Sequence, residues 1–192
     1  MSLDIVSYLM GKSGGGGGDV LPAGYTKAAY IESDGTQYID TGAPVTGDVE
    51  INIAFSFNEV PSGWLGVVGG GDGNANNAFA LLANTDHYSF QHNTTYNDES
   101  FVWEQNKQYH FDLIHGYFVD DAIVPFVQFS APNQTIWIFK VPWAASAVKA
   151  KCYKCDIRSG NSLLRHLVPA TRDSDGTAGM YDMATSTFFT LT

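Results

Sequence analysis

The stretch that decides the fold is Asp48-Val-Glu-Ile-Asn-Ile-Ala-Phe-Ser-Phe-Asn58. Apolar and polar side chains alternate along its whole length. One face would carry Val49, Ile51, Ile53, Phe55 and Phe57, and the other Glu50, Asn52, Ala54, Ser56 and Asn58. A period of two is typical of a β-strand that is buried on one side. The stretch therefore predicts a strand that covers one side of a core.

The rest of the chain, from about Gly24 to Thr192, repeats this pattern in shorter pieces. Tyr109, Phe111 and Leu113 alternate with polar neighbours. Further strands are expected at Tyr38–Thr41, Trp64–Val68, Phe79–Ala83, Tyr88–Gln91, Val124–Phe129, Ile136–Val141, Ala150–Ile157, Leu163–Val168, Ala178–Asp182 and Phe188–Leu191. Clusters of Gly, Asn, Asp and Pro separate these pieces at the spacing of a sandwich. We predict an all-β fold, a two-sheet antiparallel sandwich.

Composition and charge exclude several classes of protein. The 192 residues include 10 Lys and Arg against 20 Asp and Glu, a net charge of −10, so no basic stripe for nucleic acid is expected. No apolar run reaches the roughly 18–20 residues that span a membrane. Charged residues are 16% and aromatic residues 14% of the chain, which favours packed strands over a helical bundle.

The N-terminus divides into two segments before the predicted domain. Residues 1–11 contain Ser2-Leu-Asp-Ile-Val-Ser-Tyr-Leu-Met10, a short apolar anchor, helical or extended, that would be ordered only when docked on a partner. The side chains expected to dock are Leu3, Ile5, Val6, Leu9 and Met10. Residues 12–23 contain Gly14 to Gly18 and predict a flexible linker, and residues 24–192 form the domain. The segment has no basic start and no Ala-x-Ala site, so a secretory signal is not expected.

Two blocks of sequence bracket the domain. The first is Leu21-Pro-Ala-Gly-Tyr-Thr26 with Tyr30-Ile-Glu-Ser-Asp-Gly-Thr-Gln-Tyr-Ile-Asp-Thr-Gly42. The second is Lys154-Cys-Asp-Ile157, Leu164-Arg-His-Leu-Val-Pro-Ala170 and Arg172-Asp-Ser-Asp-Gly-Thr-Ala-Gly-Met-Tyr-Asp182. Together they resemble the concanavalin A-like, laminin-G-like jelly-roll family, while residues 43–148 carry no motif of it.

The resemblance implies a two-sheet jelly roll whose first and last strands lie near each other. Domains of this family occur in tail, fibre and other virion proteins of bacteriophages and in surface proteins of gut bacteria. The layout of a short N-terminal segment, a glycine linker and one domain also resembles phage appendage proteins. A jelly roll does not by itself imply one activity.

The chain lacks the carboxylate pattern of a jelly-roll glucanase, in which Glu-x-Asp-x-Glu lies on one face of a strand. Its nearest match, from Asp48 to Ala54, ends in an amide and an alanine. The pairs Asp98-Glu99 and Asp120-Asp121 are adjacent, so their side chains would point to opposite faces. A two-carboxylate hydrolase would have to combine distant strands, and we expect no enzyme.

Metal and redox sites are not expected either. Cys152 and Cys155 have CxxC spacing, but in a strand residues three apart point to opposite faces, so we interpret them as buried single cysteines. The five histidines form no His-x-x-x-His pair. Asp173-Ser-Asp-Gly-Thr177 resembles the start of a calcium loop, yet it lacks the later glutamate and is interpreted as a hairpin turn. Whether calcium binds near Asp173 and Asp175 stays open, and no cofactor is predicted.

A ligand-binding loop is the remaining candidate, at Trp64-Leu-Gly-Val-Val-Gly-Gly-Gly-Asp-Gly-Asn-Ala-Asn-Asn77. No helix is expected after the glycines, so it does not predict a phosphate loop. Asp and Asn side chains bind sugar hydroxyls, and an aromatic ring offers a stacking face. The residues expected to bind are Trp64, Asp72, Asn74, Asn76, Asn77, Tyr88 and Tyr96, and the alternative is a polar hairpin loop.

The expected function is that of a bacteriophage virion structural or appendage protein located on the particle. Its N-terminus would dock into other virion proteins, and its head would be displayed, with weak attachment to a host glycan. Low charge leaves apolar surface to cover, so we expect a homo-oligomer, and the fibre resemblance favours a trimer. The alternatives are a glucanase-like carbohydrate-active enzyme and a bacterial surface adhesin.

Overall fold

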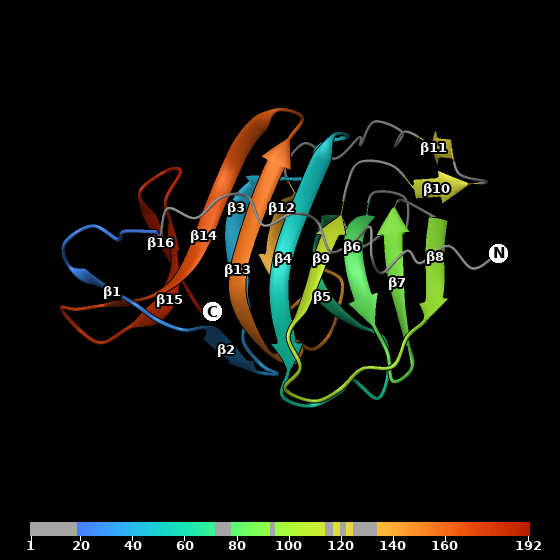
Figure 1. Ribbon diagram of the computed structural model, residues 1–192, viewed down its shortest axis with the longest axis horizontal. Helices are drawn as coiled ribbons and strands as arrows, with labels where there is room; N and C mark the ends of the chain where they lie inside the picture. The colour runs from blue at the N-terminus through green and yellow to red at the C-terminus, as the bar shows by residue number, and fades with distance from the viewer. Residues whose placement is uncertain (1–18, 72–77, 93–94, 114–116, 120–121, 125–133) are drawn as a thin grey trace.

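A computed structural model describes residues 19–71, 78–92, 95–113, 117–119, 122–124 and 134–192 (Figure 1). These residues form strands, turns and loops, and no helix occurs among them. The structure therefore confirms the all-β prediction. The described residues likewise include no helix that is long and apolar enough to cross a membrane. The expected docking residues Leu3, Ile5, Val6, Leu9 and Met10 lie outside the described part.

Two antiparallel sheets account for most of the fold (Figure 1). The eight-stranded sheet, called the large sheet, has the order β16-β15-β14-β13-β4-β9, with β1 paired to β14 and β2 to β13. Its strands are β1 (Tyr25–Lys27), β2 (Ile31–Asp34), β4 (Val49–Phe57), β9 (Tyr109–Leu113), β13 (Lys149–Ser159), β14 (Ser162–Arg172), β15 (Ala178–Asp182) and β16 (Thr187–Thr190).

The six-stranded sheet, called the small sheet, has the order β3-β12-β5-β6-β7-β8. Its strands are β3 (Ile39–Pro44), β5 (Leu65–Gly71), β6 (Ala78–Ala83), β7 (His87–His92), β8 (Thr95–Ser100) and β12 (Thr135–Ile138). A separate two-stranded ribbon joins β10 (Tyr117–Val119) to β11 (Ala122–Val124).

One apolar core joins the inner faces of the two sheets. Val49, Ile51, Ile53 and Phe55 of β4 are buried, as the alternation predicted, and they share the core with Phe79 and Leu81 of β6. Burial of apolar surface of this kind is the main stabilising contribution to a fold. The arrangement is that of a β-sandwich, with an outer face on each sheet.

The first and last strands lie near each other, because the rings of Tyr25 in β1 and Phe188 in β16 are 5.1 Å apart. The backbone N–H of Tyr38 donates to Thr192 O at 3.2 Å, and that of Thr192 donates to Tyr38 O at 2.9 Å. Contacts of the domain begin before the expected boundary at Gly24, because Leu21 packs on Val168, Ala170 and Tyr181. Residues from Asp19 onward therefore belong to the folded head.

Both cysteines are free and buried, as expected. The expectation that they point to opposite faces of their strand was wrong. Cys152 and Cys155 are each 0% exposed, so they lie on the same side of β13. The register of β13 against β4 shifts between Cys152 and Lys154, and this β-bulge adds one residue to the alternation. Burial raises the pKa of the Cys152 thiol to about 12, which keeps it protonated and unreactive.

Candidate functional site

A pocket of about 250 Å³ lies on the outer face of the small sheet. Its lining residues are Trp64, Leu82, Ser89, Gln91, Asp98 and Trp143. Leu82 comes from β6, Ser89 and Gln91 from β7, and Asp98 from β8, while the two tryptophans come from the segments that precede β5 and follow β12. The pocket thus combines three neighbouring strands with two aromatic side chains at their margin.

Strand alternation places the polar residues on this face. In β7, Tyr88 and Phe90 pack against the core, so Ser89 and Gln91 point outward. Ser89 is paired with Asp98 of β8 and with Leu82 of β6. These three residues therefore form one row across the outer face.

The segment after β12 covers part of the same face. Val141 packs with Ala80 and Leu82, and Trp143 packs against this small cluster. This segment lies very close to Gly66 of β5, where an added Cβ atom would be 2.5 Å from Val141 Cγ1. Glycine at this position lets the segment settle on the sheet and bring Trp143 to the pocket.

The pocket contains polar groups that the protein leaves available. Ser89 is 1% exposed, and its hydroxyl has no hydrogen-bond partner among the described residues. Asp98 is exposed, and its carboxylate makes no hydrogen bond or ion pair with the described residues. Buried polar groups are almost always bonded, so the Ser89 hydroxyl calls for an explanation.

The structure brings one of the predicted ligand residues, Trp64, to the pocket. Tyr88 lies on the opposite face of β7, where its ring packs 5.7 Å from Phe101 and 5.3 Å from Phe111. Burial, followed by the charge of Glu99, raises the pKa of its hydroxyl. Alternation explains the placement, because Tyr88 and Ser89 are neighbours in one strand.

The other predicted ligand residues fall outside the described part. They are Asp72, Asn74, Asn76 and Asn77, together with the side chain of Tyr96. Within the predicted loop, the residues directly after Trp64 form the seven-residue strand β5, Leu65–Gly71. A strand of this length separates its ends by about 20 Å, so Trp64 and Gly71 belong to different ends of the sheet.

Sequence reasoning missed Leu82, Ser89, Gln91, Asp98 and Trp143. A signal existed for two of them, since the stretch Tyr88-Ser-Phe-Gln91 alternates and places Ser89 and Gln91 on one face. No local signal marks Trp143, because a long connection carries it back over the sheet. The expectation that Asp98 and Glu99 point to opposite faces agrees with the Asp98 side chain lining the pocket.

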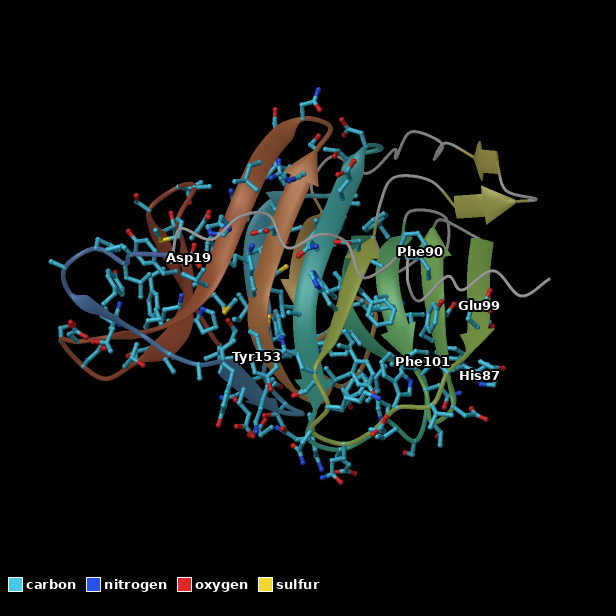
Figure 2. The ribbon with its side chains drawn as sticks, in the orientation of Figure 1. Asp19, His87, Phe90, Glu99, Phe101 and Tyr153 are labelled. Carbon is cyan, nitrogen blue, oxygen red and sulfur yellow. The ribbon has the colours of Figure 1, made fainter. Side chains whose placement is uncertain are left out.

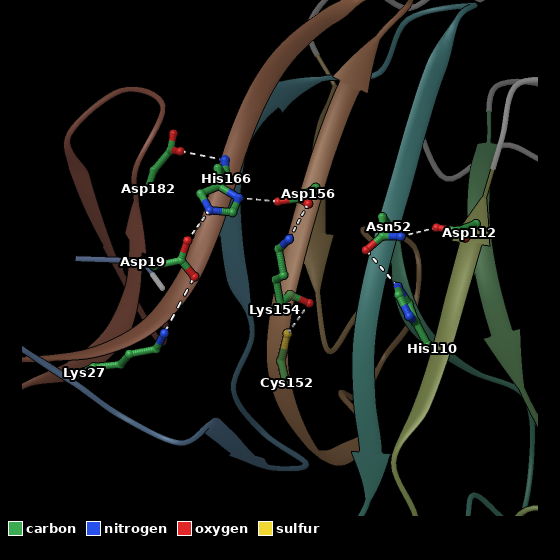
Figure 3. Close-up of polar contacts among 10 residues, drawn as sticks. All are labelled: Asp19, Lys27, Asn52, His110, Asp112, Cys152, Lys154, Asp156, His166 and Asp182. Carbon is green, nitrogen blue, oxygen red and sulfur yellow. Dashed lines mark hydrogen bonds and ion pairs between the residues drawn. The ribbon is translucent and has the colours of Figure 1, made fainter. Parts of the chain in front are cut away.

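A second polar cluster lies on the outer face of the large sheet, around His166 of β14 (Figure 3). His166 Nδ1 lies 2.6 Å from Asp156 Oδ1, and Nε2 lies 3.0 Å from Asp19 Oδ1. Lys27 Nζ lies 3.7 Å from the Asp19 carboxylate, and Lys154 Nζ lies 2.9 Å from that of Asp156. The cluster therefore alternates positive and negative charge.

The geometry favours a doubly protonated imidazole at His166. A neutral ring has one N–H, whereas both ring nitrogens here face carboxylate oxygens. Burial lowers the pKa of His166, but the hydrogen bonds and charges of Asp19 and Asp156 outweigh it, so the pKa is raised. The hydrogen bond from His166, opposed by burial, leaves the pKa of Asp19 lowered. The imidazolium of His166 in β14 thus binds Asp19, the first described residue of the head.

The polar row continues across the large sheet. Asp156 pairs with Asn52 of β4, and Asn52 pairs with Asp112 of β9. Asn52 Nδ2 donates to Asp112, and His110 Nε2 donates to Asn52 Oδ1 at 2.9 Å. Two carboxylates from separate strands, Asp156 and Asp112, therefore share one face with Asn52 between them.

The Asp173–Thr177 segment forms the predicted hairpin turn between β14 and β15. Arg172 N donates to Thr177 O at 2.9 Å, and Gly176 has a φ of +71°. The Asp175 carboxylate accepts hydrogen bonds from Arg172 and from the backbone of Thr177. Within the described ranges no three His, Cys, Asp or Glu side chains group to hold a metal ion.

A scan against protein-family models finds no matching family, and a search of the curated proteins finds no match to this chain.

Proposed function

We propose that the chain is a bacteriophage virion protein of the appendage type. Its N-terminal segment docks into other virion proteins, the glycine run acts as a tether, and the head is a jelly roll that attaches weakly to a host glycan. The phage context and the jelly-roll topology rest on the two sequence blocks that resemble that family. The display geometry rests on the positions of Asp19, the first described residue, and of the pocket.

The observation that carries the proposal is that the described chain begins on one outer face of the head, while the pocket lies on the other. The chain reaches the head at Asp19, which binds His166, and Leu21 then packs on Val168 outside the large sheet. The pocket lies outside the small sheet. Figure 2 shows Asp19 left of the centre and Glu99, the neighbour of Asp98, toward the right end of the long axis. A head held at one face can then present the other to a cell surface.

The pocket has features that suit weak binding of a sugar. An indole ring offers an apolar stacking face, and the polar groups on the adjoining strands offer hydrogen-bond partners. Weak single sites become effective when several copies act together. For this reason the proposal includes a homo-oligomer, with a trimer as the expected state, to be measured by light scattering.

Mass spectrometry of purified phage particles, together with immunogold labelling, tests the location of the protein. We expect the full chain in the particle and a chain lacking residues 1–11 to be absent from it while its head stays folded. The matched control is Trp64→Ala in the full chain, which should still be incorporated. Incorporation of the truncated chain, or absence of the full chain from particles, would contradict the proposal.

Polysaccharide hydrolysis is the second candidate, and the shared row of Asp156 and Asp112 is the observation that favours it. Two carboxyl groups on one face are what glycoside hydrolysis requires. The variants Asp156→Asn and Asp112→Asn would each abolish such an activity. If the natural chain hydrolyses a polysaccharide and both variants lose this activity, the protein is an enzyme and the display proposal is wrong.

A further inference from the structure

We propose that the pocket on the small sheet binds an alkylammonium group, a protonated or quaternary amine carried by the surface ligand. The inference rests on the proposed function in assigning the pocket to surface attachment, and it adds the chemical class of the group that enters. Four features of the described residues point to a cation.

The first feature is the aromatic margin of the pocket. Trp64 and Trp143 both line it, and Trp64 is 45% exposed although it is one of the largest apolar side chains. Indole rings are the strongest partners for organic cations, because the electron-rich face attracts positive charge. Exposure of Trp64 leaves its ring accessible to a ligand.

The second feature is that the polar lining offers acceptors. The Asp98 carboxylate accepts only, and the Ser89 hydroxyl can accept through its oxygen. A protonated amine brings N–H donors and no acceptor, so it fits this set, whereas a quaternary ammonium has no N–H and fits through its charge alone. The Ser89 hydroxyl, buried and without a partner among the described residues, would then obtain one from the ligand.

The third feature is the distribution of charge between the two sheets. The sequences of the six strands of the small sheet contain no Lys or Arg. By contrast, β13 holds four of these residues and β14 holds two. With a net charge of −10, the chain attracts cations overall, and the small sheet has no strand cation to oppose one.

The fourth feature is size. A volume of about 250 Å³ is smaller than the roughly 300–1,000 Å³ of pockets that enclose drug-sized ligands. The pocket therefore accommodates one small group, such as one amino sugar ring or one choline headgroup, and not a stretch of polysaccharide. Asp98 would pair with the charge while a tryptophan covers the carbon-bound hydrogens.

Isothermal titration calorimetry at low salt tests the inference with four probes: glucosamine, N-acetylglucosamine, glucose and choline. At about pH 6 the amine of glucosamine is charged, whereas the acetylated and parent sugars are neutral. We expect glucosamine, choline or both to bind at least about tenfold more tightly than the neutral sugars. Preference for glucosamine assigns the amine to a sugar, and preference for choline assigns it to a quaternary headgroup.

Asp98→Asn should reduce that binding at least about tenfold, since it keeps the shape and removes the charge. Glu99→Gln is the matched control, because Glu99 is the neighbouring carboxylate of β8 and does not line the pocket. Both positions are exposed, so both variants should fold. Equal binding of glucose and glucosamine, absence of binding by all four probes, or equal effects of the two variants would overturn the inference.

The outcome is separable from that of the proposed function. If neutral sugars bind and Trp64→Ala abolishes their binding, the proposed glycan attachment stands and the inferred preference for a cation is wrong. If the charged probes bind but the protein is absent from phage particles, the inferred cation site stands and the proposed virion role is wrong.

Discussion

The outer faces of the two sheets use their polar residues in different ways. On the large sheet, His166, Asp156 and Asp19 satisfy one another, and Lys154 and Lys27 complete the set. On the small sheet, the Ser89 hydroxyl is buried without a partner among the described residues. The first face is a closed network, and the second has unused bonding capacity.

The difference separates a structural role from a ligand-binding role. A polar group that is bonded inside the protein contributes to the free energy of unfolding, whereas one that is buried and unbonded lowers it. Proteins retain such groups where a ligand, a water molecule or an ion completes them. Substitutions on the large sheet should therefore reduce stability, and substitutions in the pocket should reduce binding.

Asp182→Ala should have the largest effect on stability. Asp182 is 0% exposed, and its carboxylate accepts from the backbone of His166 at 2.8 Å, from that of Ala184, and from Thr185 Oγ1. It also lies 3.6 Å from Arg165 Nε. Removing one partner of a buried ion pair costs about 3–5 kcal/mol, so urea unfolding should show a loss of this size.

Asp175→Ala is the control for that variant. Asp175 also pairs with an arginine, Arg172, but in an exposed turn where water screens the charges. Its loss of stability should be much smaller. Equal losses for the two aspartates would mean that the buried hydrogen bonds and ion pair of Asp182 are not what supports this part of the sheet.

His166→Gln should have a smaller effect that depends on pH. The raised pKa of His166 contributes stability that is complete below its ordinary value of 6.5 and is lost as the pH rises through the folded value. The lowered pKa of Asp19 contributes stability above its ordinary value of 3.8, lost as the pH falls through the folded value. The contact is therefore strongest between these two ordinary values.

Urea unfolding at several pH values measures this dependence. Near pH 5 the variant should lose about 1–2 kcal/mol, as expected for hydrogen bonds to a charged group near the surface. At about pH 9 the loss should be smaller, because the stability that the raised pKa of His166 contributes is lost as the pH rises. A loss that is the same at both pH values would show that the imidazolium is not required.

Two buried serines provide the smallest and sharpest test of the comparison. Ser33 is 0% exposed, donates to Gln37 O at 2.7 Å and accepts from Gly35 N at 3.2 Å. Ser33→Ala should cost about 1–2 kcal/mol, because it leaves these groups without a partner. Ser89→Ala should leave the free energy of unfolding unchanged or slightly raised, and thermal unfolding of both variants measures the difference. A clear loss in Ser89→Ala would show that its hydroxyl is bonded.

Much of the fold could be predicted from local sequence patterns. The alternation from Asp48 to Asn58 identified β4, and the Asp-Gly pair at Asp175 identified the turn between β14 and β15. Strand β8 was missed, because Thr95-Tyr-Asn-Asp-Glu-Ser100 lies at a sheet edge and has no apolar alternation. The expected strand Val124–Phe129 falls mostly outside the described residues.

The pocket was less predictable, for reasons of topology. It combines residues from Trp64 to Trp143, and the pairing of β6, β7 and β8 brings them together. Aromatic type alone does not separate Trp64 at the margin from Tyr88 in the core. The His166 network is equally non-local, because Asp19 and His166 are 147 positions apart in the chain.

The most direct test of the account is a chemical-shift map of the isotope-labelled protein titrated with glucosamine. The account predicts that the amide and indole signals that move belong to Trp64, Ser89, Gln91, Asp98 and Trp143, while those of His166, Asp156 and Asn52 stay fixed. Movement centred on His166 and Asp156, or no movement with glucosamine or with choline titrated in its place, would contradict the assignment of the ligand site to the small sheet.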